Sequence, residues 1–456
     1  MKLGFFTTIA ATSLLILPAT PARLLAQPTP QYTVLHRFTG PEGSTPYGSV
    51  ISDWEGNLYG TAISGGDTSD TTCQSNPFAS PGCGVVYKID RHNNESILYT
   101  FKGGTDGAFP ATELLIDEVG NLYGTARGGG IDPSGTCGFL QGCGVIFKID
   151  RHSNQSVLYS FTGGTDGIGV SSGLVRDQFG NFYGVTVAGG TTNSNCVGGG
   201  PPGTCGVVFK VDTKGNETVL HSFTGGSDGY SPYGSLIRDW QGNLFGVTDA
   251  GGDTSNTFCG TTVPALAGAN GCGVVFKIDH SGNFSVLHAF DGSDGGPYPD
   301  GWLATDYAGN IYGITGNGGN LSLCGDLGCG TVFKIDRNGK ESVLYDFTGP
   351  TAELPFLSTS FGSVIRDNQG NFYGAAYAGG DTTNAACIAA GGCGVVFKLD
   401  PRGNYTVLHI FRGTDGANPW ASLYMDQHGD IYGTTIAGGD PTCNCGVVFK
   451  ITLQQN

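Results

Sequence analysis

Acidic and aromatic residues recur at regular intervals along this sequence, in settings that could bind a polar ligand. Aspartate stands within a Gly-(Thr or Ser)-Asp-Gly segment at Asp106, Asp166, Asp228, Asp294 and Asp415. An aromatic residue follows proline at Tyr47, Tyr233 and Trp420, and Trp302 stands at a similar level of another repeat. Carboxylates can bond sugar hydroxyls while aromatic rings stack on the C–H faces of a sugar. We therefore predict a site for carbohydrate or a protein partner, formed by Tyr47, Asp228, Tyr233, Trp302, Asp415 and Trp420.

The same residues have a structural alternative, because Asp and Gly form turns and aromatic rings pack between repeats. No histidine is predicted to be catalytic. One repeat position holds either histidine (His36, His221, His288 and His409) or tyrosine (Tyr99, Tyr159 and Tyr345), which indicates that the side chain at this position packs against its neighbours. A carboxylate pair could still act on a glycan, although no pair can be singled out and the catalytic residues stay unknown. We favour a non-catalytic binding or scaffold module, and the alternative is a secreted lyase or glycan hydrolase.

The cysteines indicate structural cross-links. The 14 cysteines fall into seven pairs, one in each repeat: Cys73 and Cys83, Cys137 and Cys143, Cys196 and Cys205, Cys259 and Cys272, Cys324 and Cys329, Cys387 and Cys393, Cys443 and Cys445. Because each pair lies in one loop and export leads to an oxidising compartment, we predict a disulfide within each repeat. Zinc held by cysteines of two converging loops is the alternative. The pairing of Cys443 with Cys445 stays open, since a bridge across one residue is strained.

No cofactor or metal site is predicted. The Asp-x-x-Gly-Asn turns, such as Asp53 to Asn57, resemble parts of a calcium loop but lack its alternating acids and distal Glu, so structural calcium is kept as an alternative. No Gly-Lys-(Ser or Thr) sequence follows the glycine-rich segments, which excludes a P-loop. The formal net charge of −16 repels phosphate backbones and disfavours nucleic acid as a partner.

The elements that would position these residues are repeated. The segment Gly56-Asn57-Leu58-Tyr59-Gly60 returns, with small changes, from Gly120, Gly180, Gly242, Gly309, Gly370 and Gly429. A second segment, Gly84-Val85-Val86-Tyr87-Lys88, returns after the second cysteine of every pair. A third, Val-Leu-(His or Tyr)-x-Phe, starts at Val34, Ile97, Val157, Val219, Val286, Val343 and Val407, so one copy precedes the first repeat and none follows the last.

Each repeat holds four β-rich runs separated by turn residues, as in residues 173–177, 181–187, 206–212 and 217–223. A composition with 80 glycines and 11% aromatic residues suits many short strands. Seven such units predict an all-β, seven-bladed β-propeller, and a linear solenoid is the alternative. Residues 32–38 would supply the outer strand of the last blade and close the ring. The predicted blades cover about residues 45–101, 110–161, 169–223, 232–290, 300–347, 360–411 and 419–452.

Alternating strand directions sort the predicted loops onto two faces of the propeller. The uniform face carries the turns after the first and third strands of each blade, which vary little from Asp53 to Asn57. The variable face carries the cysteine loops and the Gly-(Thr or Ser)-Asp-Gly segments between blades. Because functional loops tend to vary on a constant scaffold, we place the predicted ligand site on the variable face, near the channel mouth.

The N-terminus has the features of a signal peptide. Lys2 precedes an apolar run from Leu3 to Leu17, and small residues follow, so we expect residues 1–26 to be removed and residues 27–31 to form a short leader. No later apolar stretch is long enough for a membrane span. We therefore expect a monomeric, secreted or periplasmic protein, with residues 32–456 in a single domain.

The seven copies of Gly-Asn-(Leu, Phe or Ile)-(Tyr or Phe)-Gly, each followed by Gly-(Val or Thr)-(Val or Ile)-(Phe or Tyr)-Lys, resemble the GloVer tandem repeat of exported bacterial "choice-of-anchor" proteins. The resemblance covers nearly the whole mature chain. It implies an exported bacterial repeat protein, often with a C-terminal sorting tail, and no established activity. This sequence ends at Gln455-Asn456 without such a tail, so we expect release or periplasmic residence rather than surface anchoring.

Overall fold

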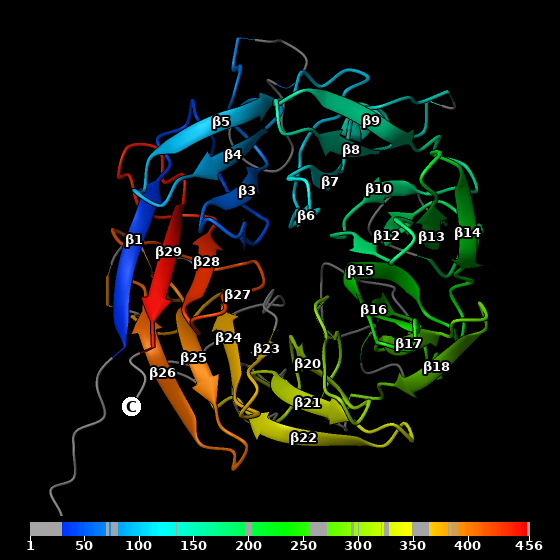
Figure 1. The fold of residues 1–456 in the computed structure, drawn as a ribbon. Helices are drawn as coiled ribbons and strands as arrows, with labels where there is room; N and C mark the ends of the chain where they lie inside the picture. The colour runs from blue at the N-terminus through cyan, green and yellow to red at the C-terminus, as the bar shows by residue number, and fades with distance from the viewer. Residues whose placement is uncertain are drawn as a thin grey trace, which may run out of the picture.

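The structure of the protein is a computed structural model that describes residues 30–69, 73, 81–133, 135–196, 203–255, 259, 271–292, 296–299, 301–320, 322, 328–348, 364–381, 383–384, 387 and 391–453. Seven antiparallel sheets stand around a central axis (Figure 1). The first strand of each sheet lies nearest the axis and the last lies at the rim. This confirms the predicted all-β, seven-bladed propeller. The predicted signal peptide lies outside the described residues.

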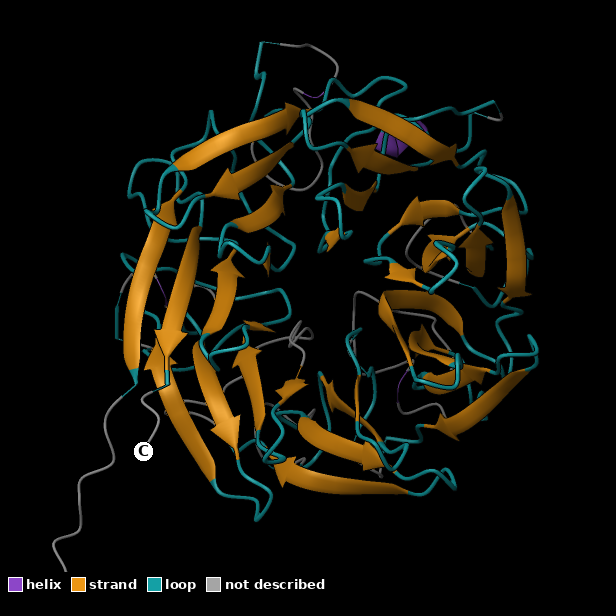
Figure 2. Cartoon of the chain, in the orientation of Figure 1, coloured by secondary structure: helices purple, strands orange, loops and turns teal. Residues whose placement is uncertain are grey.

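The blades follow one another along the chain, and strands make up almost all of their regular structure (Figure 2). Blade 1 has β2 (Ile51–Ser52), β3 (Leu58–Ala62), β4 (Val85–Ile89) and β5 (Glu95–Thr100). Blade 2 has β6 (Leu115–Ile116), β7 (Leu122–Ala126), β8 (Val145–Ile149) and β9 (Gln155–Ser160), with a short 3-10 helix at Gly138–Leu140. Blade 3 has β10 (Ile168–Val170), β11 (Val175–Arg176), β12 (Phe182–Ala188), β13 (Val207–Val211) and β14 (Glu217–Ser222).

Blade 4 has β15 (Tyr230–Arg238), β16 (Leu244–Ala250), β17 (Val274–Ile278) and β18 (Phe284–Ala289). Blade 5 has β19 (Ala304–Thr305), β20 (Ile311–Thr315), β21 (Thr331–Ile335) and β22 (Glu341–Asp346). Blade 6 has β23 (Val364–Arg366), β24 (Phe372–Ala376), β25 (Val395–Leu399) and β26 (Tyr405–Ile410). Blade 7 has β27 (Tyr424–Met425), β28 (Ile431–Thr435) and β29 (Val447–Thr452), and its outer strand is β1 (Gln31–Arg37).

The two ends of the chain close the ring. β1 runs antiparallel to β29, from Gln31 opposite Thr452 to Arg37 opposite Val447, and Figure 1 shows the blue strand beside the red one. β1 starts at Gln31, the last residue of the predicted leader, so the closing strand is longer at this end than expected. Pairing the two ends covers the edge of β29 that would otherwise be open to another chain.

The core lies within and between the blades. In blade 2 every residue of β7 and all of β8 except Lys148 are buried, which suits strands covered on both sides. Gly124 in β7 pairs with Phe147 in β8, and a Cβ at Gly124 would lie 2.6 Å from the Phe147 ring. The glycine that ends each Gly-Asn-x-x-Gly segment therefore leaves room for the aromatic ring of the third strand.

Hydrogen bonds join neighbouring blades around the inner rim. Thr61 of blade 1 donates to the carbonyl of Thr112 in blade 2 at 2.9 Å, and Thr125 of blade 2 donates to the carbonyl of Ser172 in blade 3 at 2.9 Å. Thr434 donates in the same way to the carbonyl of Gly48 at 3.1 Å, across the junction of the last and first blades. These buried bonds fix how the innermost segments sit around the channel.

Disulfides cross-link the loops of the variable face. Six of the predicted pairs are bonded in the structure: Cys73–Cys83, Cys137–Cys143, Cys196–Cys205, Cys259–Cys272, Cys387–Cys393 and the pair that sequence left open, Cys443–Cys445. Cys324 of the remaining pair lies outside the described residues. Disulfides persist in oxidising compartments, so the protein belongs outside the cytoplasm. No helical turn in the described part of the chain is long and apolar enough to cross a membrane.

Candidate functional site

Three aromatic rings from three blades meet on the variable face, at the channel mouth. Tyr47 precedes β2, Trp420 precedes β27, and Tyr377 follows β24, so all three lie at the same end of the propeller. The ring centroids of Tyr47 and Trp420 are 5.0 Å apart and those of Tyr377 and Trp420 are 5.6 Å apart, both in edge-to-face contact. All three side chains are half-buried. Sequence reasoning named Tyr47 and Trp420 but missed Tyr377.

A guanidinium group lies within electrostatic range of this aromatic cluster. Burial raises the pKa of Tyr47, Tyr377 adds to the rise, and the charge of Arg127 from blade 2 acts against it. Arg127 has the same position after the second strand of blade 2 as Tyr377 has in blade 6. The mouth thus combines aromatic faces with the hydrogen-bond donors of a guanidinium group.

A hydrogen-bonded bridge occupies the channel deeper along the innermost segments. The Glu113 carboxylate of blade 2 accepts the Trp302 indole N–H of blade 5, with Nε1 3.1 and 3.2 Å from the two oxygens. It also accepts the Ser235 hydroxyl of blade 4. Glu113 reaches these partners across Gly173 of blade 3, where a Cβ would lie 2.5 Å from the Glu113 carboxyl carbon. One carboxylate therefore links three blades and requires glycine in a fourth.

Two of the predicted aromatic site residues, Trp302 and Tyr233, contact other residues of the fold. Trp302 is 8% exposed and belongs to the bridge with Glu113. Tyr233 lies in β15 opposite Val247 and packs against the core between blades 2 and 3. Of the predicted aromatic residues, Tyr47 and Trp420 are the pair that the structure brings into ring contact.

The predicted acids Asp228 and Asp415 lie at the outer rim, bonded to histidines of the outer strands. Asp228 lies 3.1 Å from His221 Nε2 and accepts the Thr224 backbone N–H at 3.0 Å. Asp415 lies 3.0 Å from His409 Nε2. Burial alone would raise the pKa of Asp228, but the hydrogen bonds from His221 and Thr224 hold it below its ordinary value.

The shared His and Tyr position of the outer strands now has a physical reason. Tyr99 donates to Asp106 at 2.7 Å and Tyr159 donates to Asp166 at 3.0 Å, as the histidines bond their acids in blades 3 and 6. The acid follows its partner by seven residues in three blades and by six in the other. That spacing was the signal in the sequence, and it supports a structural role for these acids. Asp294, the remaining acid of this type, lies outside the described residues.

Carboxylates on the uniform face accept hydrogen bonds from residues of their own turns. Asp53 Oδ1 accepts the backbone N–H of Glu55 and Asn57, while Oδ2 accepts the Asn57 amide at 2.7 Å and the Tyr59 hydroxyl at 2.9 Å. Burial opposes ionisation, yet these bonds, led by those from Asn57, hold the pKa of Asp53 below its ordinary value. Four donors around one carboxylate explain the repeated Asp-x-x-Gly-Asn-x-Tyr pattern as a turn.

Asp132, Cys137 and Cys143 have metal-ligand spacing within the described part of the chain. The two cysteines are joined as a disulfide, so neither offers a thiolate. Asp132 accepts the backbone N–H of Thr136 at 3.1 Å and of Cys137 at 2.9 Å. This arrangement therefore orders the loop around the disulfide.

One further acid on the variable face was missed in the sequence. Asp249 lies near the end of β16, at the position that Arg127 and Tyr377 occupy in their own blades. Burial raises its pKa to about 7, so its carboxyl is partly protonated at neutral pH. An acid at a position where the other repeats have neutral, apolar or basic residues was the signal available in the sequence.

Comparisons with known proteins identify the family. No curated protein matches the chain. Solved structures that resemble it include a protein suggested to be a gluconolactonase (9% identity, 92% of this chain and 91% of that one, TM-score 0.41). A gluconolactonase from Xanthomonas campestris shows 14% identity over 68% of this chain and 79% of that one, with a TM-score of 0.37.

The extracellular domain of a suggested one-component system protein from B. thetaiotaomicron shows 10% identity, with 93% of this chain covered and a TM-score of 0.51. The match spans 40% of that chain, and at this identity it supports the propeller fold alone. The model of the Gloeobacter/Verrucomicrobia repeat matches residues 24–257, 138–388 and 325–456. Since these matches together cover nearly all of the sequence, the chain belongs to the Gloeobacter/Verrucomicrobia (GloVer) repeat family.

Proposed function

We propose that the protein is an extracytoplasmic, non-catalytic binding module that holds a carbohydrate at the channel mouth of the variable face. The observation that carries the proposal is the contact between Tyr47, Tyr377 and Trp420, three half-buried rings supplied by three different blades. Clustered, partly exposed rings offer flat faces on which the C–H surface of a sugar can stack. Arg127 supplies donors for hydroxyl or carboxylate oxygens at the same mouth.

The location fits this proposal. Disulfides support a compartment outside the cytoplasm, and the expected signal peptide would lead to the periplasm or the medium. A protein partner at the same mouth is the alternative ligand, because aromatic residues and arginine are also enriched in protein interfaces. We expect the module to act as a monomer.

Two variants test the ligand site. Stacked aromatic anchors carry much of the energy of a binding site, so Trp420→Ala should weaken glycan binding by about five- to a hundredfold, or roughly 1 to 3 kcal/mol. Gln427→Ala, in a turn of the uniform face, is the control and should leave affinity unchanged. Binding is measured by calorimetry with oligosaccharides selected on a glycan array. Loss of binding in Gln427→Ala together with normal binding in Trp420→Ala would contradict the proposed site.

Asp249 supports a second candidate function, a glycan lyase or hydrolase that uses carboxylates of the variable face. A carboxyl group with a pKa of about 7 is suited to donate a proton near neutral pH. Incubation with polysaccharides should then release new reducing ends or unsaturated products, and Asp249→Asn should abolish that release while leaving binding intact. If the wild-type protein binds the polysaccharide saturably and releases no product, the result supports the binding module.

A further inference from the structure

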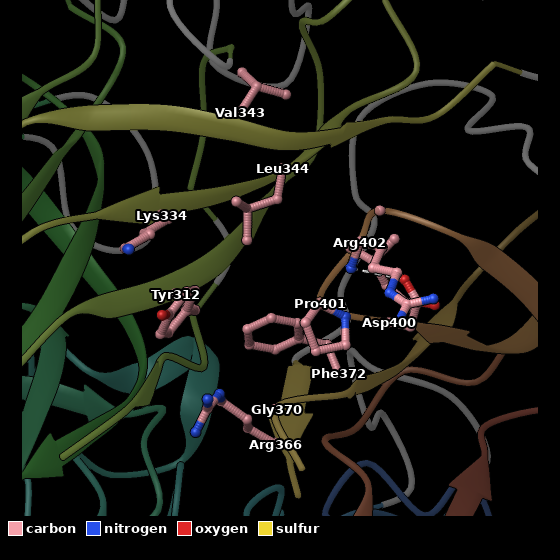
Figure 3. Close-up of a pocket in the computed structure, with 12 residues that line it drawn as sticks. Tyr312, Lys334, Val343, Leu344, Arg366, Gly370, Phe372, Asp400, Pro401 and Arg402 are labelled. Carbon is pink, nitrogen blue, oxygen red and sulfur yellow. Dashed lines mark hydrogen bonds between the residues drawn. The ribbon is translucent and has the colours of Figure 1, made fainter. Parts of the chain in front are cut away.

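A pocket opens at the seam between blades 5 and 6, where the turns of the uniform face lie (Figure 3). Its volume is about 360 Å³, within the usual range of small-molecule sites. Figure 3 shows Leu344 and Phe372 facing each other, with Tyr312 and Arg366 on one side and Pro401 on the other. The apolar part of the lining could therefore cover one face of a sugar-sized ligand.

The charge of the pocket is opposite to that of the protein. Lys334, Arg366 and Arg402 line it together with a single acid, Asp400, which gives 3 − 1 = +2 on a chain of formal charge −16. The Asp400 carboxylate is occupied within its own turn, where it accepts the backbone N–H groups of Arg402 at 2.8 Å and Asn404 at 2.9 Å. Figure 3 shows Lys334 and Arg366 on one side of the pocket and Arg402 on the other, beside Asp400, so the charge of Asp400 acts on Arg402 more than on the other two cations.

Two corresponding cations elsewhere in the ring have acidic partners. Lys450 lies 2.6 Å from Asp430 within blade 7, and Arg176 lies 3.8 Å from Glu118 across the seam between blades 2 and 3. Among the described residues, Lys334, Arg366 and Arg402 form no ion pair within 4.0 Å, and Arg366 Nε is buried without a hydrogen-bond partner. A buried donor without a partner indicates a site that a ligand or solvent oxygen completes.

Both acidic partners have neutral counterparts in blade 5. Asn310 has the turn position in blade 5 that Asp430 has in blade 7, so Lys334 lacks the acid that Lys450 has. Tyr307 has the turn position in blade 5 that Glu118 has in blade 2, so Arg366 lacks the acid that Arg176 has. The seam between blades 5 and 6 therefore has both cations and neither acid, and asparagine also stands at the Asp430 position in the other blades.

The cations are held in place before any ligand binds. The Arg366 guanidinium lies 5.9 Å from the ring centroids of both Tyr312 and Phe372, and Lys334 Nζ lies 5.9 Å from Tyr312.

The seam between blades 5 and 6 is also wider than two other seams between neighbouring blades. A Cβ at Gly215 or Gly339 would lie 2.7 Å from the leucine carbonyl oxygen of the preceding blade, whereas one at Gly403 would lie 3.9 Å from Leu344 O.

We propose that this pocket binds an anionic sugar, a uronate unit of an acidic polysaccharide, separately from the ligand of the variable face. Arg366 and Lys334 bind the carboxylate, with Arg402 at the exposed edge. Leu344, Phe372 and Pro401 cover the C–H face of the ring. A guanidinium fork matches the two carboxylate oxygens, and a small cation cluster on an acidic protein selects for one charged unit rather than for a highly charged polymer such as nucleic acid.

Exposed aromatic rings on the same face could hold the neighbouring units of such a polymer. The turns after β2, β11, β15 and β19 carry Trp54, Phe179, Trp240 and Tyr307, with exposed fractions of 89, 73, 82 and 94%. Exposed aromatic faces of this kind can stack on the C–H faces of sugar rings. These turns follow the innermost strands, so their rings surround the second mouth of the channel.

Calorimetry with a defined pair of probes tests the proposal. The disulfide-intact mature protein is titrated with a galacturonate trisaccharide and with its methyl ester, which has the same sugar rings but no charge. The acid should bind at least about tenfold more tightly than the ester, because charge-assisted hydrogen bonds are lost in the ester. Equal affinity for the two probes, or no binding of the acid at millimolar concentration, would overturn the proposal.

Matched variants locate the site. Arg366→Gln should weaken binding of the acid by about ten- to a hundredfold, whereas Arg176→Gln should leave it unchanged. Arg176 lies 5.7 and 6.0 Å from the rings of Tyr123 and Phe182, so its loss has a similar structural cost. Asn310→Asp gives Lys334 an acidic partner and should also weaken binding. Normal binding in both Arg366→Gln and Asn310→Asp would refute the pocket, and loss in Trp420→Ala alone would assign the acid to the variable face.

Discussion

Replacing two half-buried glutamates at the outer rim should stabilise the protein at neutral pH. Glu95 begins β5 near Glu42 of the preceding seam, and Glu217 begins β14 near Asp166. One carboxylate oxygen of each is buried without a hydrogen-bond partner. Burial, followed by the charge of the neighbouring acid, raises both pKa values to about 7. Blade 2 has Gln155 at this position, and its amide donates to the Asp106 carbonyl at 3.0 Å.

The size and sign of the effect follow from the two pKa values. A rise from 4.5 to about 7 corresponds to at most about 3 kcal/mol for each glutamate, and partial solvent exposure reduces this to about 1 to 2 kcal/mol. Because the folded pKa lies above the unfolded one, the folded state binds more protons between these values. The free energy of unfolding therefore falls as pH rises from about 4.5 to about 7, and the loss is complete above pH 7.

The double variant Glu95→Gln/Glu217→Gln removes this loss. Its free energy of unfolding should exceed that of the wild-type protein by about 2 to 4 kcal/mol at pH 8 and by little at pH 4. Guanidinium unfolding with the disulfides intact, followed by tryptophan fluorescence, measures the difference at both pH values. The reciprocal change Gln155→Glu should destabilise the protein at pH 8. A double variant no more stable than wild type at pH 8 would refute this account of the rim.

Three further outcomes are expected. Removing residues 27–38 should expose the edge of β29 and cause aggregation or a lower unfolding midpoint, so a monomeric truncated protein of unchanged stability would argue against ring closure by β1. A non-reduced proteolytic digest read by mass spectrometry should show Cys259 linked to Cys272 and the other pairs linked within repeats, and predominant links between repeats would contradict the structure. Gly173→Ala should displace Glu113 from its bridge and lower the unfolding free energy by about 1 to 3 kcal/mol, and an unchanged midpoint would show that the channel tolerates the methyl group.

Much of the fold could be predicted because every blade repeats the same local chemistry. The Asp53 to Tyr59 segment contains its own turn, its own hydrogen bonds and its own strand, and these interactions lie within seven residues. The copy of the Val-Leu-(His or Tyr)-x-Phe segment at the N-terminus likewise indicated how the ring closes. Local interactions of this kind can be predicted from the sequence.

The site depended on contacts between distant residues. Glu113 and Trp302 could be noticed as large residues where other repeats have Ser49, Gly173 or Ser422, but their hydrogen bond joins blades 2 and 5. Tyr377 reaches Trp420 only because the ring brings the start of blade 7 beside the second strand of blade 6. The contact of the Asp228 carboxylate with His221 at the rim likewise became visible in the structure.

Sequence alone therefore determined the repeat, the number of blades and the closing strand, and it predicted the cysteine pairs except Cys443 with Cys445, because each depends on residues near one another or on a pattern copied seven times. Tertiary structure alone decided which side chains meet at the channel and which seams stay open. Those outcomes depend on how seven similar but unequal blades fit around one axis. The role proposed for Lys334 likewise depends on the pocket that the structure places around it.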